Sequence, residues 1–329
     1  MKQVLLFDTA LNTSNLGDEI IYDDCKKGLS SVLDEALIFR MATHVVNYSS
    51  YQLIRMEDGK ITRLCDWADY KFVCGTNLLT DKLWRVNPQW MVNPINARLY
   101  KDCILVGVGK ISEYDKPNRY TSNIYKKILS RKYKHSVRDS ATKKVLNDLG
   151  FDAINTGCPT LWGFDRDKCA AIPTGKAENV IFTVSGYNKQ RAPQQDKRMI
   201  QILKENYNKL YLWVQTVMDE RYFKELMSDT PVEVTPIYSL NKYKEILLKG
   251  NVDYVGTRLH GGVYAMQNNV RSMVIAIDQR SRGFHEDNNL PILEREDIEK
   301  LESLVHSEWK TDIRIDNDAI NEFVSQFKT

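Results

Sequence analysis

The residues with the clearest chemical potential lie in one short segment late in the chain. Residues 256–265 read Gly-Thr-Arg-Leu-His-Gly-Gly-Val-Tyr-Ala, so Arg258 and His260 stand two positions apart between a predicted strand and a predicted helix. Arginine can bind a carboxylate or phosphate bidentately, and histidine can transfer a proton near neutral pH. In an extended loop both side chains would project on one side. The segment predicts an anion site with acid–base capability, in which Gly261 and Gly262 keep the helix N-terminus open to a ligand.

Two further segments place arginines directly after predicted strands. Arg138 follows the short run Ser-Val, and Arg280 and Arg282 follow the apolar run at residues 272–277. Ligands of open parallel sheets bind at the carboxyl ends of the strands, so these side chains are candidates for holding an anion. The competing interpretations are a turn ordered by an Arg138–Asp139 pair and solvated charge around Arg280.

The segment Asn15-Leu16-Gly17-Asp18 follows the first predicted strand and begins a predicted helix. Gly17 permits close backbone approach. An acidic side chain such as Asp18 is suited to orienting or deprotonating a sugar hydroxyl rather than to contacting a phosphate. The competing interpretation is that Asn15 or Asp18 only caps the helix.

Composition excludes several classes of protein. The 329 residues are 43% hydrophobic, and 46 basic against 43 acidic residues leave a net charge of +3, too weak a bias to predict nucleic-acid binding. No apolar run is long enough to span a bilayer, and the first residues do not form a secretory signal. The six cysteines never form a C-x-x-C pair, which argues against a zinc site or a disulfide framework. We expect a soluble cytoplasmic protein with no bound metal.

Short apolar runs alternate with helical patterns along most of the chain, which is typical of parallel α/β sheets. We predict an α/β fold of two Rossmann-like domains facing a cleft: residues 1–165 on the acceptor side, residues 178–315 on the donor side, and 316–329 as a C-terminal helix that packs back. A turn-rich linker is expected at 163–178. Strands are predicted at 3–7, 70–74, 103–108, 136–138, 152–155, 179–184, 210–215, 232–234, 252–256 and 272–277, and helices at 140–149, 198–206, 240–248, 260–267 and 318–327.

The order of four motifs resembles the polysaccharide pyruvyl transferase family. They are N-x-G-D from Asn15, V-R-D around Arg138, G-C-P at residues 157–159 and R-L-H-G from Arg258. The resemblance implies a two-domain arrangement similar to GT-B glycosyltransferases. It also implies transfer of pyruvate from phosphoenolpyruvate to two hydroxyls of a sugar, which gives a cyclic ketal and releases phosphate.

Phosphoenolpyruvate carries a carboxylate and a phosphate on a small frame, so its site needs several cations and a proton donor. With arginines and a histidine neutralising this co-substrate, we expect no cofactor. We also expect Arg258→Ala to remove donor binding with little change in melting temperature. The family commonly has a lysine after its last strand, where this chain has Arg280 and Arg282. The resulting assignments are His260 and Asp18 as catalytic residues, Arg138, Arg258, His260 and Arg280 as donor-binding residues, and Asn15, Gly17 and Asp18 as acceptor-binding residues.

Two other functions remain open on the sequence alone. A GT-B glycosyltransferase that uses a nucleotide sugar would share the fold and the preference for cations. A non-catalytic protein that binds a sugar or an anion could use the same scaffold and would tolerate loss of His260.

The acceptor sugar belongs to a polysaccharide or to its lipid-linked precursor, and in the second case the protein would contact the inner membrane surface. A basic segment at residues 119–135 suits such a surface, although a solvated helix face explains it equally well. A tryptophan-rich stretch at 51–96 is a candidate sugar platform, with the core as the more frequent alternative. The residues concerned are Arg119, Lys126, Lys127, Arg131, Lys132 and Lys134 with Tyr120, Tyr125 and Tyr133 in the first, and Trp67, Trp84 and Trp90 in the second.

Overall fold

The computed structural model describes residues 1–54, 60–85, 89–111 and 114–327. The chain divides into two compact units. Unit 1 comprises Met1–Thr13, Asp18–Trp162 and Asp316–Thr329, and unit 2 comprises Ser14–Gly17 and Gly163–Ile315. The segment 163–178, expected as a linker, is grouped with unit 2 and contains a short helix, α7 (Arg166–Ala170).

The described part of unit 1 contains a six-stranded sheet with the order β2-β1-β3-β4-β5-β6, in which each neighbouring pair is parallel. The sequence predicted every strand of this sheet except β2. That strand lies at the edge of the sheet, and most of its side chains are not buried, although residues 36–39 are all apolar. The strands are β1 (Lys2–Asp8), β2 (Ala36–Ala42), β3 (Tyr70–Leu79), β4 (Ile104–Lys110), β5 (His135–Val137) and β6 (Ala153–Asn155).

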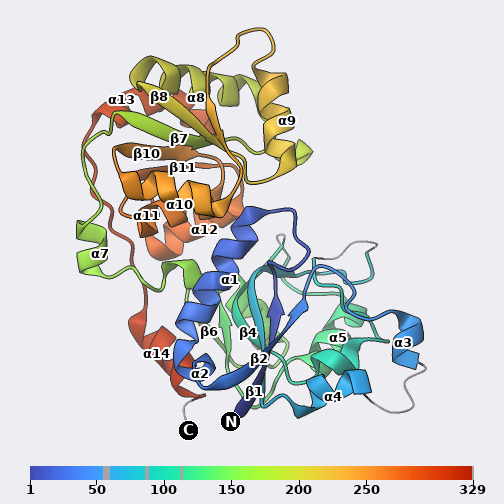
Figure 1. Cartoon of the computed structure of the whole chain (residues 1–329). Coiled ribbons are helices and arrows are strands. Elements are labelled where there is room, and N and C mark those ends of the chain that lie inside the picture. The colour runs from blue at the N-terminus through green and yellow to red at the C-terminus, as the bar shows by residue number, and fades with distance from the viewer. Residues whose placement is uncertain (55–59, 86–88, 112–113, 328–329) are drawn as a thin grey trace. The chain divides into compact units, whose positions relative to one another are not determined.

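Alternate residues of β1 point to opposite faces of this sheet and enter two different cores. Val4 and Leu6 pack in one core with side chains of α1 and of the C-terminal segment, whereas Leu5 and Phe7 pack in the other with side chains of α5 and α6. The helical segments of unit 1 are α1 (Leu16–Gly28), α2 (Ser30–Leu33), α3 (Ser50–Ile54), α4 (Lys60–Trp67), η1 (Ala97–Tyr100), α5 (Arg119–Ile128), α6 (Ser140–Asp148), η2 (Pro159–Leu161) and α14 (Asn317–Ser325) (Figure 1).

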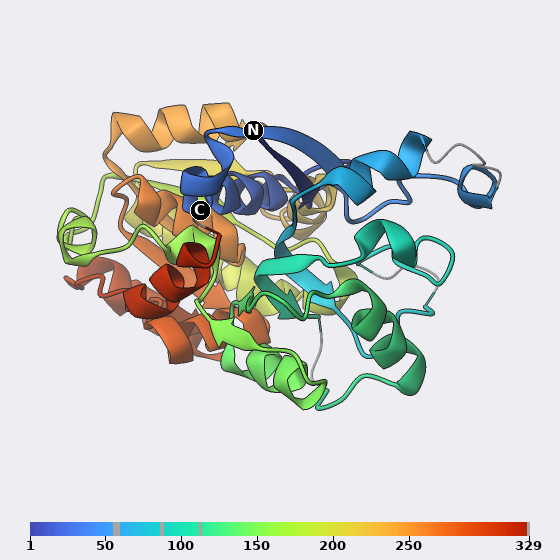
Figure 2. The same cartoon turned by 90° about the horizontal axis from the view of Figure 1, so that it is seen from below.

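The C-terminal segment completes the first of these cores. Phe327 makes edge contacts with Tyr70 and Phe72, with ring centroids 5.4 and 4.9 Å away. Its carbonyl oxygen also accepts a hydrogen bond of 3.4 Å from Lys2 Nζ, so the last described residue lies beside the start of β1 (Figures 1 and 2).

The described part of unit 2 contains a second six-stranded parallel sheet, with the order β12-β11-β10-β7-β8-β9. Its central strands begin and end close to the predicted positions. The two edge strands do not: β12 was not predicted, and the strand predicted at 232–234 instead occupies Thr235–Ile237. The strands are β7 (Asn179–Thr183), β8 (Lys209–Trp213), β9 (Thr235–Ile237), β10 (Val252–Gly256), β11 (Ser272–Ala276) and β12 (Ile292–Glu294).

The core of unit 2 is formed by β7, β8, β10 and β11 against α8 and α9, with Phe182, Leu212 and Ile200 among its fully buried side chains. The helical segments besides α7 are η3 (Asn188–Gln190), α8 (Pro193–Asn206), α9 (Val217–Leu226), α10 (Leu240–Lys249), α11 (Leu259–Gln267), α12 (Gln279–Asn288), η4 (Arg295–Lys300) and α13 (Leu301–His306).

Two chain-wide expectations can be compared with the fold. The sequence argued against a disulfide framework, and all six cysteines are buried free thiols in the structure. Among the described residues, no helix is both long enough and apolar enough to cross a membrane.

Candidate functional site

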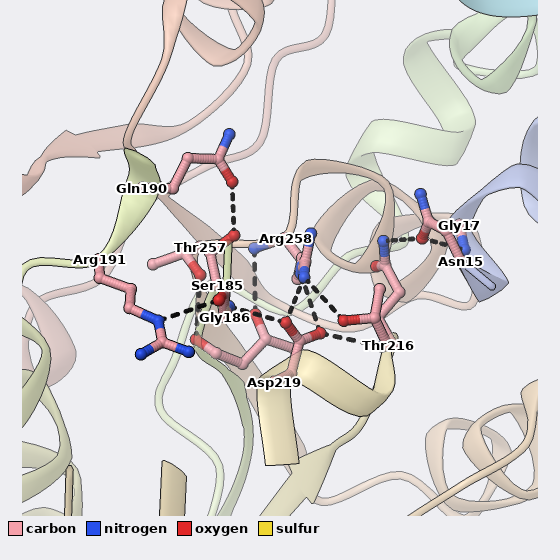
Figure 3. Close-up of polar contacts among 12 residues, drawn as sticks. Asn15, Gly17, Ser185, Gly186, Gln190, Arg191, Thr216, Asp219, Thr257 and Arg258 are labelled. Carbon is pink, nitrogen blue, oxygen red and sulfur yellow. Dashed lines mark hydrogen bonds and ion pairs between the residues drawn. The ribbon is translucent and has the colours of Figure 1, made fainter. Parts of the chain in front are cut away.

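The loops that follow four neighbouring strands of unit 2 form one polar cluster. Since β11, β10, β7 and β8 are adjacent and parallel, their carboxyl ends lie along the same sheet edge. The loops contribute Asp278, Arg258, the pair Ser185-Gly186, and Gln215 with Thr216. Figure 3 shows most of these side chains and their contacts (Figure 3).

Arg258 and Asp219 form the centre of this cluster. Arg258 Nε donates to Asp219 Oδ2 over 3.1 Å, and Arg258 Nη2 donates to Asp219 Oδ1 and, over 3.3 Å, to Thr216 Oγ1 (Figure 3). The carboxylate is fully buried and also accepts from the backbone N–H groups of Gly186 (2.9 Å) and Thr216 (3.0 Å). Each oxygen of Asp219 therefore has at least two donors, as a buried charge requires.

The position of the Arg258 guanidinium is fixed from several sides. Its carbon lies 4.6 Å from the centre of the Tyr187 ring, and its backbone N–H donates to Thr183 Oγ1 over 3.1 Å. Within the described ranges, no group bonds to its Nη1 atom. Asp219 therefore holds the Nε–Nη2 edge of the guanidinium.

Arg280 lies in the same cluster, at the start of α12. Asp278 accepts from Arg280 through Nε (2.9 Å) and Nη2 (2.6 Å) and from Gln190 Nε2 (3.0 Å), while Gln190 Oε1 accepts from Ser185 Oγ (2.7 Å). Burial tends to raise the pKa of the Asp278 carboxyl, but Arg280 outweighs it and holds the pKa below its ordinary value. The expected alternative of purely solvated charge is therefore wrong for Arg280.

His260 does not lie in an extended loop, as the sequence suggested. Helix α11 begins at Leu259, so Arg258 caps the helix and His260 belongs to its first turn. The imidazole is buried and meets the Phe284 ring edge-on, with ring centroids 6.2 Å apart. A basic side chain thus stands beside an arginine at a helix N-terminus, where an anion is stabilised by the helix dipole.

Gly261 and Gly262 serve packing rather than an open helix end. A Cβ atom on Gly261 would lie 2.5 Å from the Trp213 ring, and one on Gly262 would lie 2.7 Å from Val274. Both glycines are buried on the side of α11 that faces the sheet. The interpretation that they keep the N-terminus open to a ligand is therefore wrong.

The acceptor-binding candidates divide between the two units. Asn15 and Gly17 belong to unit 2, where Gln215 Nε2 donates to Asn15 Oδ1 over 2.6 Å and the Gly17 N–H donates to the same oxygen over 3.0 Å. Asp18 belongs to unit 1, where its Oδ2 accepts from Thr13 Oγ1 over 2.6 Å. Asp18 lies inside the first turn of α1 (Leu16–Gly28) and is not the residue that precedes the helix.

Arg138 also belongs to unit 1, directly after β5. Its guanidinium is buried, donates through Nη2 to Asn77 Oδ1, and has Nε 3.6 Å from Asp139 Oδ2. Asn77 follows Thr76, whose φ of 66° is unusual for a β-branched residue, at a register shift of β3. Arg138 is thus buried, and it does not form an exposed pair with Asp139 that merely orders a turn.

The sequence did not identify the residues that hold these arginines in place. Asp219 had a detectable signal, because Thr216-x-x-Asp219 after a predicted strand is a capping box, which the structure contains. No sequence signal marks Gln215, Tyr187, Gln190 or Asn77, because they contact residues from distant parts of the chain.

The surface segments proposed from the sequence are only partly as expected. Trp90 is fully buried, whereas Trp67 and Trp84 are 61% and 63% exposed; part of the stretch 51–96 lies outside the described residues. In the basic segment, Tyr125 is buried and bonded to Thr80, and Tyr133 packs on Tyr70 and Phe327. These two tyrosines are therefore core residues rather than interfacial ones.

Comparison with protein families gives a match over residues 15–279 to polysaccharide pyruvyl transferase. The matched range includes every candidate site residue except Arg280. The chain belongs to the polysaccharide pyruvyl transferase family. It is therefore an enzyme of this kind, and the non-catalytic alternative is not retained. No sequence among curated proteins matches the chain.

Solved structures show the fold of this pyruvyl transferase. The UDP co-structure of MnaA from S. aureus has 12% identity and a TM-score of 0.56, covering 98% of this chain and 94% of that one. The UDP-GlcNAc 2-epimerase of Methanocaldococcus jannaschii, in complex with UDP-GlcNAc and UDP, has 11% identity and a TM-score of 0.55, with 99% of each chain covered. The expectation of two Rossmann-like α/β units similar to the GT-B fold is confirmed.

Proposed function

We propose that the enzyme transfers pyruvate from phosphoenolpyruvate to two hydroxyls of a sugar, in a polysaccharide or its lipid-linked precursor, to form a pyruvate ketal and phosphate. Family membership supports the pyruvyl transfer itself. The observation that carries the choice of donor is the cluster at one sheet edge of unit 2. It combines Arg258, Arg280 and His260 with the N-termini of α11 and α12.

The reaction sets the tasks of the site. Two C–O bonds form at C2 of phosphoenolpyruvate, and the C2–O bond to phosphate breaks. One hydroxyl proton in effect reaches the methylene carbon, which becomes a methyl group, and the other leaves with phosphate. The enzyme therefore needs anion-binding groups, one proton donor and one proton acceptor.

We assign these tasks to the candidate residues. Arg258 and Arg280 bind the carboxylate and phosphate of the donor, and Arg138 of unit 1 adds a third guanidinium. His260 supplies the proton to the methylene carbon or stabilises the departing phosphate. Asp18 receives the proton of an attacking hydroxyl, and Asn15 and Gly17 contact the acceptor.

The proposal needs no divalent cation, because guanidinium groups and helix N-termini neutralise the donor. Within the described residues, no group of three or more His, Cys, Asp or Glu side chains is placed to hold a metal ion. Treatment with a chelator should leave activity intact. Inactivation that added Mn²⁺ or Mg²⁺ reverses would favour a metal-held diphosphate instead.

The competing function is a GT-B enzyme that acts on a nucleotide sugar, because the structures with the same fold contain UDP or UDP-GlcNAc. A thermal-shift titration with phosphoenolpyruvate and, separately, UDP-GlcNAc distinguishes the two. A ligand at 100 times its Kd stabilises the native state by about 2.7 kcal/mol. We expect phosphoenolpyruvate to raise the melting temperature and UDP-GlcNAc to leave it unchanged; the reverse result would transfer the assignment to the nucleotide-sugar enzyme.

If the acceptor is carried by a lipid at the inner leaflet, the exposed cations of the basic segment provide the contact. Lys126 and Lys127 lie on the exposed side of α5, whereas Arg131 already bonds to Gly150 and stacks on Phe151. Each cation near an anionic surface adds about 1 kcal/mol of attraction. Co-sedimentation with phosphatidylglycerol vesicles should fall when Lys126, Lys127, Arg131 and Lys132 are neutralised together. Absence of binding by the parent enzyme would exclude this contact.

A further inference from the structure

The amide of Gln215 has an orientation that the hydrogen bonds around it determine. The Gly17 N–H can only donate, so the atom of Asn15 that it meets at 3.0 Å must be the oxygen Oδ1. The atom of Gln215 that lies 2.6 Å from the same oxygen must then be the donor Nε2. The other atom of this amide is consequently the acceptor Oε1.

Among the described residues, this acceptor has no donor. Gln215 is only 5% exposed, and within the described ranges no N–H or O–H group bonds to its Oε1. Leaving a buried acceptor without a donor costs about 1–3 kcal/mol. The Nε2 atom of the same side chain bonds to Asn15 Oδ1, so within the described ranges the atom of this amide that has no partner is Oε1.

The location of Gln215 indicates which molecule could supply the donor. Its backbone oxygen accepts from Leu16 N–H over 3.1 Å, so it holds the segment Ser14–Gly17 on unit 2. The next residue, Thr216, bonds to Arg258 Nη2. Gln215 therefore bonds to the acceptor-binding candidate Asn15 and is the neighbour in sequence of a residue that bonds to Arg258.

We propose that Gln215 Oε1 accepts a hydrogen bond from a hydroxyl of the acceptor sugar, which makes Gln215 a specificity-determining residue of the transfer. The inference rests on the proposed function. An amide is not basic enough to remove a proton, so Gln215 orients the sugar and does not deprotonate it. Sugars lacking that hydroxyl leave Oε1 unbonded and bind less tightly.

Gly17 belongs to the same arrangement. A Cβ atom at this position would lie 2.7 Å from Gln215 Nε2 and 3.2 Å from Asn15 Oδ1, so any side chain displaces the amide. Gly17→Ala therefore offers a second route to the same defect without altering Gln215.

The test uses phosphate release from phosphoenolpyruvate with methyl glucoside, methyl galactoside or methyl mannoside as acceptor, whichever reacts, and with its monodeoxy analogues. Gln215→Met keeps the length of the side chain and removes the amide. We expect a rise of about tenfold in KM for the acceptor, the size of one lost hydrogen bond, with KM for phosphoenolpyruvate unchanged. With the wild-type enzyme, one deoxy analogue should react worse than the sugar that carries the hydroxyl. With Gln215→Met, the two sugars should react equally well.

Gln326→Met is the matched control, because Gln326 bonds through both amide atoms to the Lys134 backbone in unit 1 and should leave both KM values unchanged. If Gln215→Met does not fold, Gly17→Ala must reproduce the acceptor KM effect. The inference is wrong if the wild-type enzyme and Gln215→Met have equal KM values for the acceptor. It is also wrong if the deoxy analogue still reacts worse than its parent sugar with Gln215→Met. Neither result contradicts the proposed function. A wild-type enzyme that neither binds phosphoenolpyruvate nor releases phosphate from it overturns the proposed function as well.

Discussion

Arg258 Nε and Nη2 both face the carboxylate of Asp219, although the two residues are 39 positions apart in the chain. Asp219 is fully buried, and Arg258 is 5% exposed. The arginine proposed to bind the donor therefore also neutralises a buried negative charge. Under the proposed function, donor binding and the stability of unit 2 depend on the same pair.

Arg258→Ala should consequently weaken both properties, which changes the expectation of an almost unaltered melting temperature. Removing one partner of a buried ion pair typically costs about 3–5 kcal/mol. Urea denaturation should report this loss, and calorimetry should show at least a tenfold weaker affinity for phosphoenolpyruvate. The double variant Arg258→Met with Asp219→Asn should recover part of the stability and none of the affinity. Recovery of affinity in the double variant would exclude a direct role for Arg258.

His260 is tested by its contribution to turnover. A general acid typically contributes about 10²–10⁴-fold in rate, so His260→Ala should lower kcat by that order. His260→Gln should recover little, because glutamine forms hydrogen bonds but does not supply a proton. Steady-state kinetics with saturating phosphoenolpyruvate measure this directly. Near-parental kcat in the glutamine variant would assign His260 a structural role against Phe284.

Asp18 should affect turnover without affecting the donor. Asp18→Asn still accepts the hydrogen bond from Thr13 but no longer takes up a proton. We expect a lower kcat and an unchanged affinity for phosphoenolpyruvate in calorimetry. Since Asp18 lies inside the first turn of α1, its carboxylate also interacts favourably with the helix dipole, worth about 0.3–1 kcal/mol. If Asp18→Asn keeps full activity and is slightly less stable, Asp18 only stabilises the N-terminus of α1.

Gly262→Ala should destabilise unit 2 because the added methyl group meets Val274 at 2.7 Å and Tyr254 at 2.9 Å. Overpacking of this kind typically costs about 1–3 kcal/mol. Gly283 is the matched control: it also lies in a helix, α12, but a Cβ atom there would have no neighbour within 4 Å. Gly283→Ala should therefore stabilise the protein by about 0.5–1 kcal/mol. Equal melting temperatures for the two alanine variants would show that α11 can move away from its sheet.

The buried side chain of His135 should make the stability of the folded protein depend on pH. Its Nδ1 accepts from the Leu105 N–H (3.1 Å) and its Nε2 faces the Ser130 carbonyl (2.9 Å), so the buried ring is neutral, and burial lowers its pKa to about 4. The unfolded chain protonates this histidine near pH 6.5, so its contribution is complete above that value and is lost as the pH falls toward 4. The difference between the pKa in the unfolded chain and in the folded protein corresponds to roughly 3 kcal/mol of stability. Urea denaturation at pH 7 and pH 4 should show a smaller difference for His135→Gln than for the wild-type protein, and equal differences would contradict the assignment.

The central strands of both sheets were predictable because continuous apolar runs are required where a parallel strand is buried on both faces. Edge strands carry no such requirement. Ala36–Ala42 has several exposed side chains, and β9 contains Pro236, which is tolerated at an edge. The sequence therefore located the interior of each sheet better than its margins.

The candidate site was predictable only for residues whose own type suggests chemistry. Arg258 and His260 follow a clear strand, so their position at a sheet edge could be inferred. Asp219 and Gln215 act through partners that the fold brings near from other loops. Sequence spacing does not contain that information, since the partners are 39 and 200 residues away.

The packing of the C-terminal segment into unit 1 affects how the protein is made. Phe323 and Phe327 cover the face of the first sheet that carries Val4, Leu6 and Phe72, yet the ribosome delivers them only after all of unit 2. At about 5–20 residues per second, the delay is on the order of 10 s. During that interval the nascent chain displays an uncovered apolar face, which is the kind of surface that chaperones bind. Unit 2, by contrast, contains no segment that is synthesised after residue 315.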